Sequence, residues 1–361
     1  MKGRCASLLL VLCLAFSQAL SAASVVFLNP GRTNEPFWVS YAQFMQAAAS
    51  DLGIALEVKF AERDMQRMLD QAREVLQGPH RPDYLVFVNE QYSGPEILRL
   101  SRGSGVKLFT VNSTLTADQQ ALVGGTRERY PDWIGSMVAN EEEAGYLMAR
   151  DLLEQQQRLA PGRPVEMLAF SGVKQTPAAK HREQGLMRAL AEFPQVRLRQ
   201  LVYSEWNRDR AYVQAQQLFP RYPAVKLVWS ANDEMAFGAM RAAAELGRKP
   251  GQDLRFSALN NSPEVLRAYL DGSVGSLVSG HFTLGGWAMV LLHDYDAGLD
   301  FAQHGGKDRE VRLFQALDRN EAASLLRHIE QRGYDLDFRT FSLLGRKGAR
   351  DYRFSLQPLI D

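Results

Sequence analysis

The chain has 361 residues, 46% of them hydrophobic and 23% charged, and a formal net charge of +1 at pH 7. This length exceeds what one small core needs and suits two lobes of roughly 150 residues each. A charge so close to zero excludes the strong attraction to nucleic acids, membranes or polyanions that a basic chain shows. We therefore expect no nucleic-acid partner.

The first residues have the pattern of a secretory signal peptide. Two basic residues precede an apolar run at residues 8–16, and small residues follow at 21–23. The apolar run is too short to span a bilayer, so we predict a cleavable signal over residues 1–23 and a mature protein located in the periplasm. The two cysteines, Cys5 and Cys13, lie inside this signal. Disulfides therefore contribute nothing to the predicted mature fold.

From residue 25 onward, short apolar runs alternate with helical patterns. The predicted strands are residues 25–28, 54–60, 84–88, 106–111, 165–170, 196–203, 225–229, 254–259 and 275–278. The predicted helices are residues 36–52, 64–76, 95–102, 141–157, 178–193, 210–219, 233–247, 264–270 and 283–295. Residues 114–133 interrupt this rhythm, being polar and rich in turn residues. The repetition predicts an α/β fold of two similar lobes, each with a parallel sheet flanked by helices.

The stretch at residues 225–247 shows where a site would form. A buried strand ends at Ser230, a polar cluster follows, and Asp233 and Glu234 occupy the first turn of the next helix. Ligands of open α/β sheets bind beyond the carboxyl ends of strands. Asn232 is therefore a candidate ligand contact, although it is equally well placed to cap the helix.

Polar and aromatic residues recur at other strand ends. The candidate ligand-binding residues are Glu35, Phe37, Trp38, Glu90, Asn112, Lys180, Arg182, Trp206, Asn232, Asn260 and His281. Asparagine donates and accepts hydrogen bonds and aromatic rings offer apolar faces, so the set suits a neutral, hydroxyl-rich molecule.

Enzymatic and metal motifs are absent from the sequence. It contains no G-x-S-x-G, H-E-x-x-H, Walker A or G-x-G-x-x-G motif. The six histidines are scattered, and we interpret the local group of His293, Asp294 and Asp296 as a solvated helix face rather than a metal site. We predict no catalytic residue, metal or cofactor.

Four segments carry a resemblance to a known family. They are residues 34–38, with two adjacent aromatics; residues 178–182, with a cationic helix start; residues 204–208, with a third aromatic; and residues 230–247. In these segments the chain resembles the type I periplasmic binding proteins of the ribose-binding kind. The resemblance implies two Rossmann-like lobes joined by three crossing segments, which close on the ligand by a hinge.

The resemblance also implies a domain division and a function. The first lobe is expected over residues 24–138 and 281–315, and the second over residues 139–280 and 316–361. The expected function is capture of a small polar ligand, sugar or sugar-like, for delivery to an inner-membrane ABC permease. We expect a monomer and no enzymatic activity.

Alternatives remain open at this point. Asn112 and Asn260 stand where the family often has aspartates, and relatives with altered sites include sensors that act on a membrane histidine kinase. A periplasmic enzyme with Glu35 or Glu90 as acid or base is a second alternative. The effector lobes of a transcription repressor share the fold, but the signal peptide and the lack of a helix-turn-helix segment argue against that class.

Overall fold

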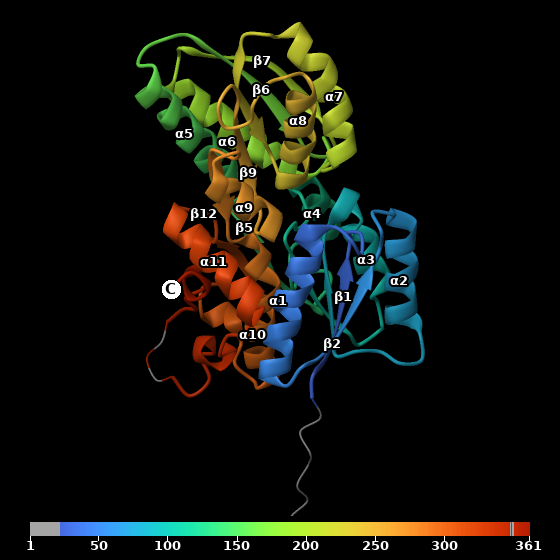
Figure 1. Ribbon diagram of the computed structural model, residues 1–361. Helices are drawn as coiled ribbons and strands as arrows, with labels where there is room; N and C mark the ends of the chain where they lie inside the picture. Colours follow the sequence, from blue (N-terminus) through green and yellow to red (C-terminus); the bar gives the residue numbers. More distant parts are fainter. Residues whose placement is uncertain (1–21, 347, 349) are drawn as a thin grey trace, which may run out of the picture.

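The computed structural model describes residues 22–346, 348 and 350–361, so residues 1–21 of the predicted signal peptide lie outside it. Figure 1 shows two lobes, with the N-terminal strands in one and the central third of the chain in the other. Across these described residues, no helix combines the length and the apolar character needed to cross a membrane.

The first lobe contains a parallel sheet in the order β11-β5-β4-β3-β1-β2. Its strands are β1 (Ser24–Asn29), β2 (Ala55–Phe60), β3 (Tyr84–Phe87), β4 (Lys107–Val111), β5 (Trp133–Ala139) and β11 (Asp308–Val311). Its helices are α1 (Pro36–Leu52), α2 (Met65–Gln77), α3 (Gly94–Leu100), α4 (Ala117–Val123) and α10 (Leu284–Asp296). Side chains alternate along β1, so Val25 and Phe27 join the core under α1 and α10, whereas Val26 and Leu28 join the core under α2 and α3.

The second lobe contains a sheet in the order β12-β10-β9-β8-β6-β7, parallel except for β12, which runs antiparallel to β10. Its strands are β6 (Val165–Ser171), β7 (Val196–Tyr203), β8 (Val225–Ser230), β9 (Arg255–Leu259), β10 (Ser276–Ser279) and β12 (Gln315–Ala316). Its helices are α5 (Glu141–Leu159), α6 (Pro177–Glu192), α7 (Arg208–Arg221), α8 (Asp233–Glu245) and α9 (Pro263–Asp271). Helix α5 packs against α6, and α7 packs against α8. The predicted two-lobed α/β fold is confirmed.

Strand β5 is the main element that the sequence pattern does not indicate. Gly135 and Ser136 interrupt its apolar run, which hides the strand from a periodicity argument. Gly135 is needed there, because a Cβ at this position would come within 2.4 Å of the Lys307 carbonyl oxygen and 2.9 Å of the Phe301 ring. The close approach of residues 301 and 307 thus requires a glycine where an apolar side chain would have indicated a strand.

The chain passes between the lobes at residues 139–141, 279–284 and 311–315, where it leaves one sheet and enters elements of the other lobe. The C-terminal segment then differs from the predicted division, which placed all of residues 316–361 in the second lobe. Helix α11 (Arg319–Arg332) packs on α9 as expected, but the short 3₁₀ helix η4 (Phe338–Phe341) packs on α1 and α10 of the first lobe. The tail therefore contacts both lobes.

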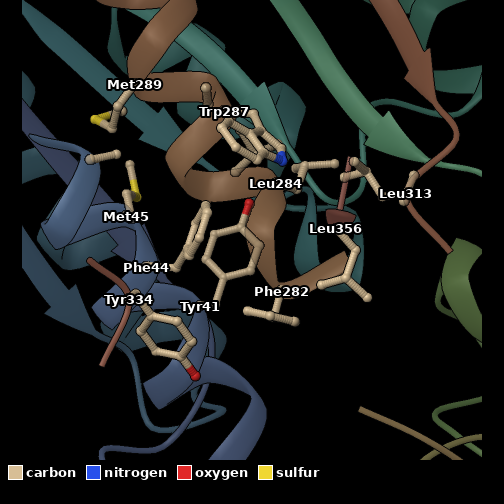
Figure 2. Close-up of a cluster of buried hydrophobic side chains, with 14 of the residues drawn as sticks. Tyr41, Phe44, Met45, Phe282, Leu284, Trp287, Met289, Leu313, Tyr334 and Leu356 are labelled. Carbon is tan, nitrogen blue, oxygen red and sulfur yellow. The ribbon is translucent and has the colours of Figure 1, made fainter. Parts of the chain in front are cut away.

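Aromatic packing and one buried carboxylate explain why the tail returns. Tyr334 lies against Phe44 of α1, with ring centroids 5.7 Å apart, and Figure 2 shows both side chains in the same cluster. Asp294 of α10 is fully buried and accepts hydrogen bonds from the tail, including one of 2.9 Å from the Tyr352 hydroxyl. The prediction that this part of α10 forms a solvated face is therefore wrong for Asp294, which anchors the tail.

Candidate functional site

The site is a cleft between the lobes, at the carboxyl ends of strands from both sheets. It is lined by Glu35, Phe37, Trp38, Arg63, Glu90, Asn112, Ser113, Thr176, Ala178, Arg182, Trp206, Asn232, Asn260 and His281. The empty space among these side chains, including its mouth, is about 480 Å³.

A partly buried ion-pair group forms the first-lobe end of the cleft. Arg63 Nε donates to Glu35 Oε2 at 3.0 Å, and Arg63 Nη1 donates to Glu90 Oε1 at 2.9 Å. Burial alone would lower the pKa of the Arg63 guanidinium, but the two carboxylates outweigh it and raise that pKa, so the side chain stays charged. One cation therefore fixes two acceptors in place.

Arg63 is the residue in this group that sequence reasoning missed. It follows β2 in a turn with a left-handed φ of 62°, just before Asp64 caps α2. A charged residue directly beyond a strand end is the signal that could have identified it, by the same argument that identified Glu35 and Glu90.

Aromatic rings line the cleft on the first-lobe side. Phe37 stacks on His281, with ring centroids 4.4 Å apart and planes 13° apart. Trp38 is only 2% exposed and packs against Gly31, where a Cβ would come within 2.2 Å of the indole. Burial, followed by the positive charge of Arg182, lowers the pKa of His281 well below its ordinary value. The imidazole is therefore neutral at physiological pH and can both donate and accept a hydrogen bond.

On the second-lobe side, Trp206 and Arg182 lie together. The Arg182 guanidinium lies 5.3 Å from the centroid of the Trp206 ring, which packs against Gly172. Arg182 Nε donates to Glu141 Oε2 at 2.6 Å and its Nη1 donates to the Ala231 carbonyl at 2.7 Å. These two partners hold the 5% exposed guanidinium at the wall of the cleft.

The three predicted asparagines all line the cleft, and each is held differently. Asn112 has a left-handed φ of 65° at the end of β4. Asn232 caps α8 by accepting from the Met235 amide at 2.9 Å through Oδ1, while its Nδ2 makes no hydrogen bond to any described residue. Asn260 Nδ2 donates to Asp233 Oδ1 at 2.5 Å. Asn232 therefore combines the two roles that the sequence left as alternatives, since it caps a helix and lines the cleft.

Behind Asn260 lies a buried carboxyl group. Asp233 is 0% exposed; its Oδ1 also accepts from the Glu234 amide at 2.9 Å, and its Oδ2 accepts from Ser262 Oγ at 2.9 Å. Burial, with a smaller contribution from Glu234, raises the pKa of Asp233 to about 7 despite the hydrogen bonds that oppose the shift. Asp233 thus positions Asn260 without itself lining the cleft.

Lys180 is the predicted site residue that the structure does not bring into the cleft. It is exposed on α6, and its Nζ donates to the Tyr92 hydroxyl of the first lobe at 3.3 Å. Ser113, Thr176 and Ala178 line the cleft although sequence reasoning did not select them. In the described part of the chain, no three His, Cys, Asp or Glu side chains are grouped so that they could hold a metal ion.

Comparison with known proteins gives a consistent family. The model of the periplasmic binding protein domain matches residues 25–299. A crystal structure described as a periplasmic sugar-binding protein from Pseudomonas fluorescens is 59% identical, covers 94% of this chain and 100% of its own, and superimposes with a TM-score of 0.87.

More distant matches include one relative in sequence and one in structure. The ribose import binding protein RbsB of Escherichia coli (strain K12) is 24% identical over 276 residues, which is 75% of this chain and 85% of the relative. A crystal structure of a galactofuranose binding protein is 18% identical, with 86% of this chain and 100% of that chain covered, and has a TM-score of 0.71.

Proposed function

Because the chain belongs to the periplasmic binding protein domain family, we propose that it is an exported protein that binds a neutral sugar between its lobes and delivers it to an ABC permease of the inner membrane. The names of its relatives support this proposal, since the Pseudomonas fluorescens protein is described as sugar-binding and RbsB as a ribose import binding protein. The family is one of binding proteins, which supports a non-catalytic role for the cleft.

One observation carries the choice of a neutral ligand. The two carboxylates of the cleft, Glu35 and Glu90, are both bonded to Arg63, and Arg182 is paired with Glu141. Neither arginine that lines the cleft is therefore free to bind an anionic ligand, which would have to disrupt an ion pair that is already formed. A sugar needs no such exchange, because its hydroxyl groups can donate to carboxylate oxygens and accept from amides.

The aromatic residues supply the second requirement of a sugar site. Phe37 and Trp38 belong to the first lobe and Trp206 to the second, so a ring between them would contact apolar surface on both lobes. A ligand can contact both lobes at once only in the closed form, so its binding shifts the equilibrium of the protein from the open form to the closed form. Closure is the signal that a membrane partner would recognise.

A thermal-shift screen of the mature protein tests whether the ligand is a neutral sugar. We expect neutral pentoses, hexoses or their furanose forms to raise the melting temperature, because a ligand at about 100 times its Kd adds about 2.7 kcal/mol of stability. The Trp206→Ala variant should lose this shift. Stabilisation only by amine oxides or by sugar phosphates would contradict the proposal.

Two further measurements separate the alternatives. Chemical analysis of the ligand recovered from the complex should return it unchanged, whereas an enzyme would return a product. Co-purification from membranes should then recover a permease; recovery of a histidine kinase in its place would assign the protein to sensing and contradict delivery.

A further inference from the structure

A second hollow adjoins the cleft. It is lined by Asn112, Ser113, Thr114, Leu115, Thr116, Ala117, Val138, Ala139, Glu141, Pro177, Ala178, His181 and Glu310. We call this hollow the annex. Its empty space, including its opening to solvent, is about 720 Å³, and it shares Asn112, Ser113 and Ala178 with the cleft. The two spaces are therefore neighbours that share part of a wall.

Both lobes contribute walls to the annex. The first lobe supplies the segment between β4 and α4, the end of β5 and Glu310 of β11, and the second lobe supplies Glu141 at the start of α5 and the first turns of α6. A group bound in the annex would therefore contact both lobes, as a ligand in the cleft does. Such contacts add to the free energy that favours closure.

We propose that the annex receives a substituent of the bound sugar, so that the physiological ligand is a glycoside rather than a free monosaccharide. This proposal rests on the proposed function. The glycosidic position is the natural attachment point, because the anomeric carbon is where sugars carry their substituents. The cleft then holds the sugar ring, and the annex discriminates between ligands that share this ring.

The charges of the annex specify the kind of substituent. Glu141 is 5% exposed and Glu310 is exposed, and each carboxylate has one oxygen bonded by the protein: Glu141 Oε2 by Arg182 and Glu310 Oε1 by Asn140. Glu141 Oε1 makes no hydrogen bond within the described part of the chain. Carboxylates accept hydrogen bonds, and among the described residues neither a lysine nor an arginine lines the annex, so the annex suits a substituent with hydroxyl groups and disfavours a phosphate.

Ala117 allows the annex to be filled without touching the cleft. It is exposed at the start of α4 and lines the annex but not the cleft, and the helix is capped independently by Thr116 and Gln119. Ala117→Phe would occupy the annex with an aromatic ring. Ala121 is exposed on the same helix and lines neither space, so Ala121→Phe is the matched control.

The experiment is titration calorimetry of the parent protein and both variants. The probes are D-ribose, D-allose, L-arabinose and D-galactose, each as the free sugar, the 1-O-glyceryl glycoside and the 1-phosphate. For the sugar that binds best, we expect the glyceryl glycoside to bind at least tenfold more tightly than the free sugar and the phosphate to bind more weakly. Ala117→Phe should remove the glycoside advantage and leave the free sugar within twofold, whereas Ala121→Phe should change neither.

The outcomes distinguish the two levels of the argument. Tight binding of a free sugar with tenfold weaker binding of its glycoside would overturn the annex proposal and leave sugar binding intact. Equal losses for both ligands in Ala117→Phe would also overturn it. If no sugar in any form binds the parent protein, the proposed function fails and the annex proposal fails with it.

Discussion

The buried carboxyl group of Asp233 should give the protein a distinctive pH dependence of stability. Its pKa is raised from 3.8 to about 7 by burial. Between these values the folded protein retains a proton that the unfolded chain has released, so the free energy of unfolding falls as the pH rises through this window. Asp233→Asn abolishes the titration, and the introduced amide can still accept from Asn260 and donate to the Ser262 hydroxyl.

The expected size follows from the two pKa values. Each pKa unit corresponds to roughly 1.4 kcal/mol, and most of the window lies between pH 5 and pH 8. Ionisation of Asp233 should therefore lower the free energy of unfolding of the parent protein by at most about 2.5 kcal/mol between pH 5 and pH 8. The other titrating groups are common to parent and variant and cancel in the comparison.

The assay is urea unfolding of the mature parent and of Asp233→Asn at pH 5 and pH 8. The variant should gain stability relative to the parent as the pH rises, by up to the amount given above. If the difference between the two proteins is the same at both pH values, the carboxyl group ionises freely in the folded state and the reasoning about its burial is wrong.

Two other changes test the ion-pair group and the tail. Arg63→Met leaves the Glu35 and Glu90 carboxylates without their cation, so sugar binding should fall at least tenfold and stability by about 1–3 kcal/mol. Calorimetry measures the affinity and urea unfolding the stability, and a variant that matches the parent protein in both would contradict the role given to the ion-pair group. Tyr334→Phe removes the 2.9 Å hydrogen bond that Asn261 Nδ2 donates to the Tyr334 hydroxyl, and leaves a buried amide unpaired. The free energy of unfolding should fall by about 1–3 kcal/mol in the same urea assay. An unchanged unfolding midpoint would show that this contact does not hold the tail.

Most of the cleft could be predicted because strand ends are legible in the sequence. Apolar runs followed closely by polar residues identified Glu90, Asn112 and Asn260, and a parallel sheet places such positions at one edge. The same reasoning failed for Lys180. Successive residues of a helix are about 100° apart, so Lys180 and Arg182 point in different directions and only the latter can face the cleft.

The tail could not be placed from the sequence for a different reason. Its aromatic residues follow neither a helical nor a strand period, so nothing in the pattern shows which surface they cover. Their partners, such as Trp287, with which Phe354 stacks at 5.2 Å, lie on α10, whose own pattern is apolar on nearly every side. An apolar pattern on every side of a helix indicates that other elements cover the helix completely, but it does not identify which segment of the chain supplies the cover.

The central claim is that residues of both lobes hold a neutral sugar, and Asn232→Asp tests it most directly. Aspartate preserves the helix cap through its carboxylate oxygen, because Asn232 caps with Oδ1, but it replaces the Nδ2 donor with a charged acceptor. Calorimetric titration with the sugar that the thermal screen identifies should show at least a tenfold loss of affinity, with the melting temperature of the free protein maintained. Affinity equal to that of the parent protein would contradict the assignment of this cleft as the binding site.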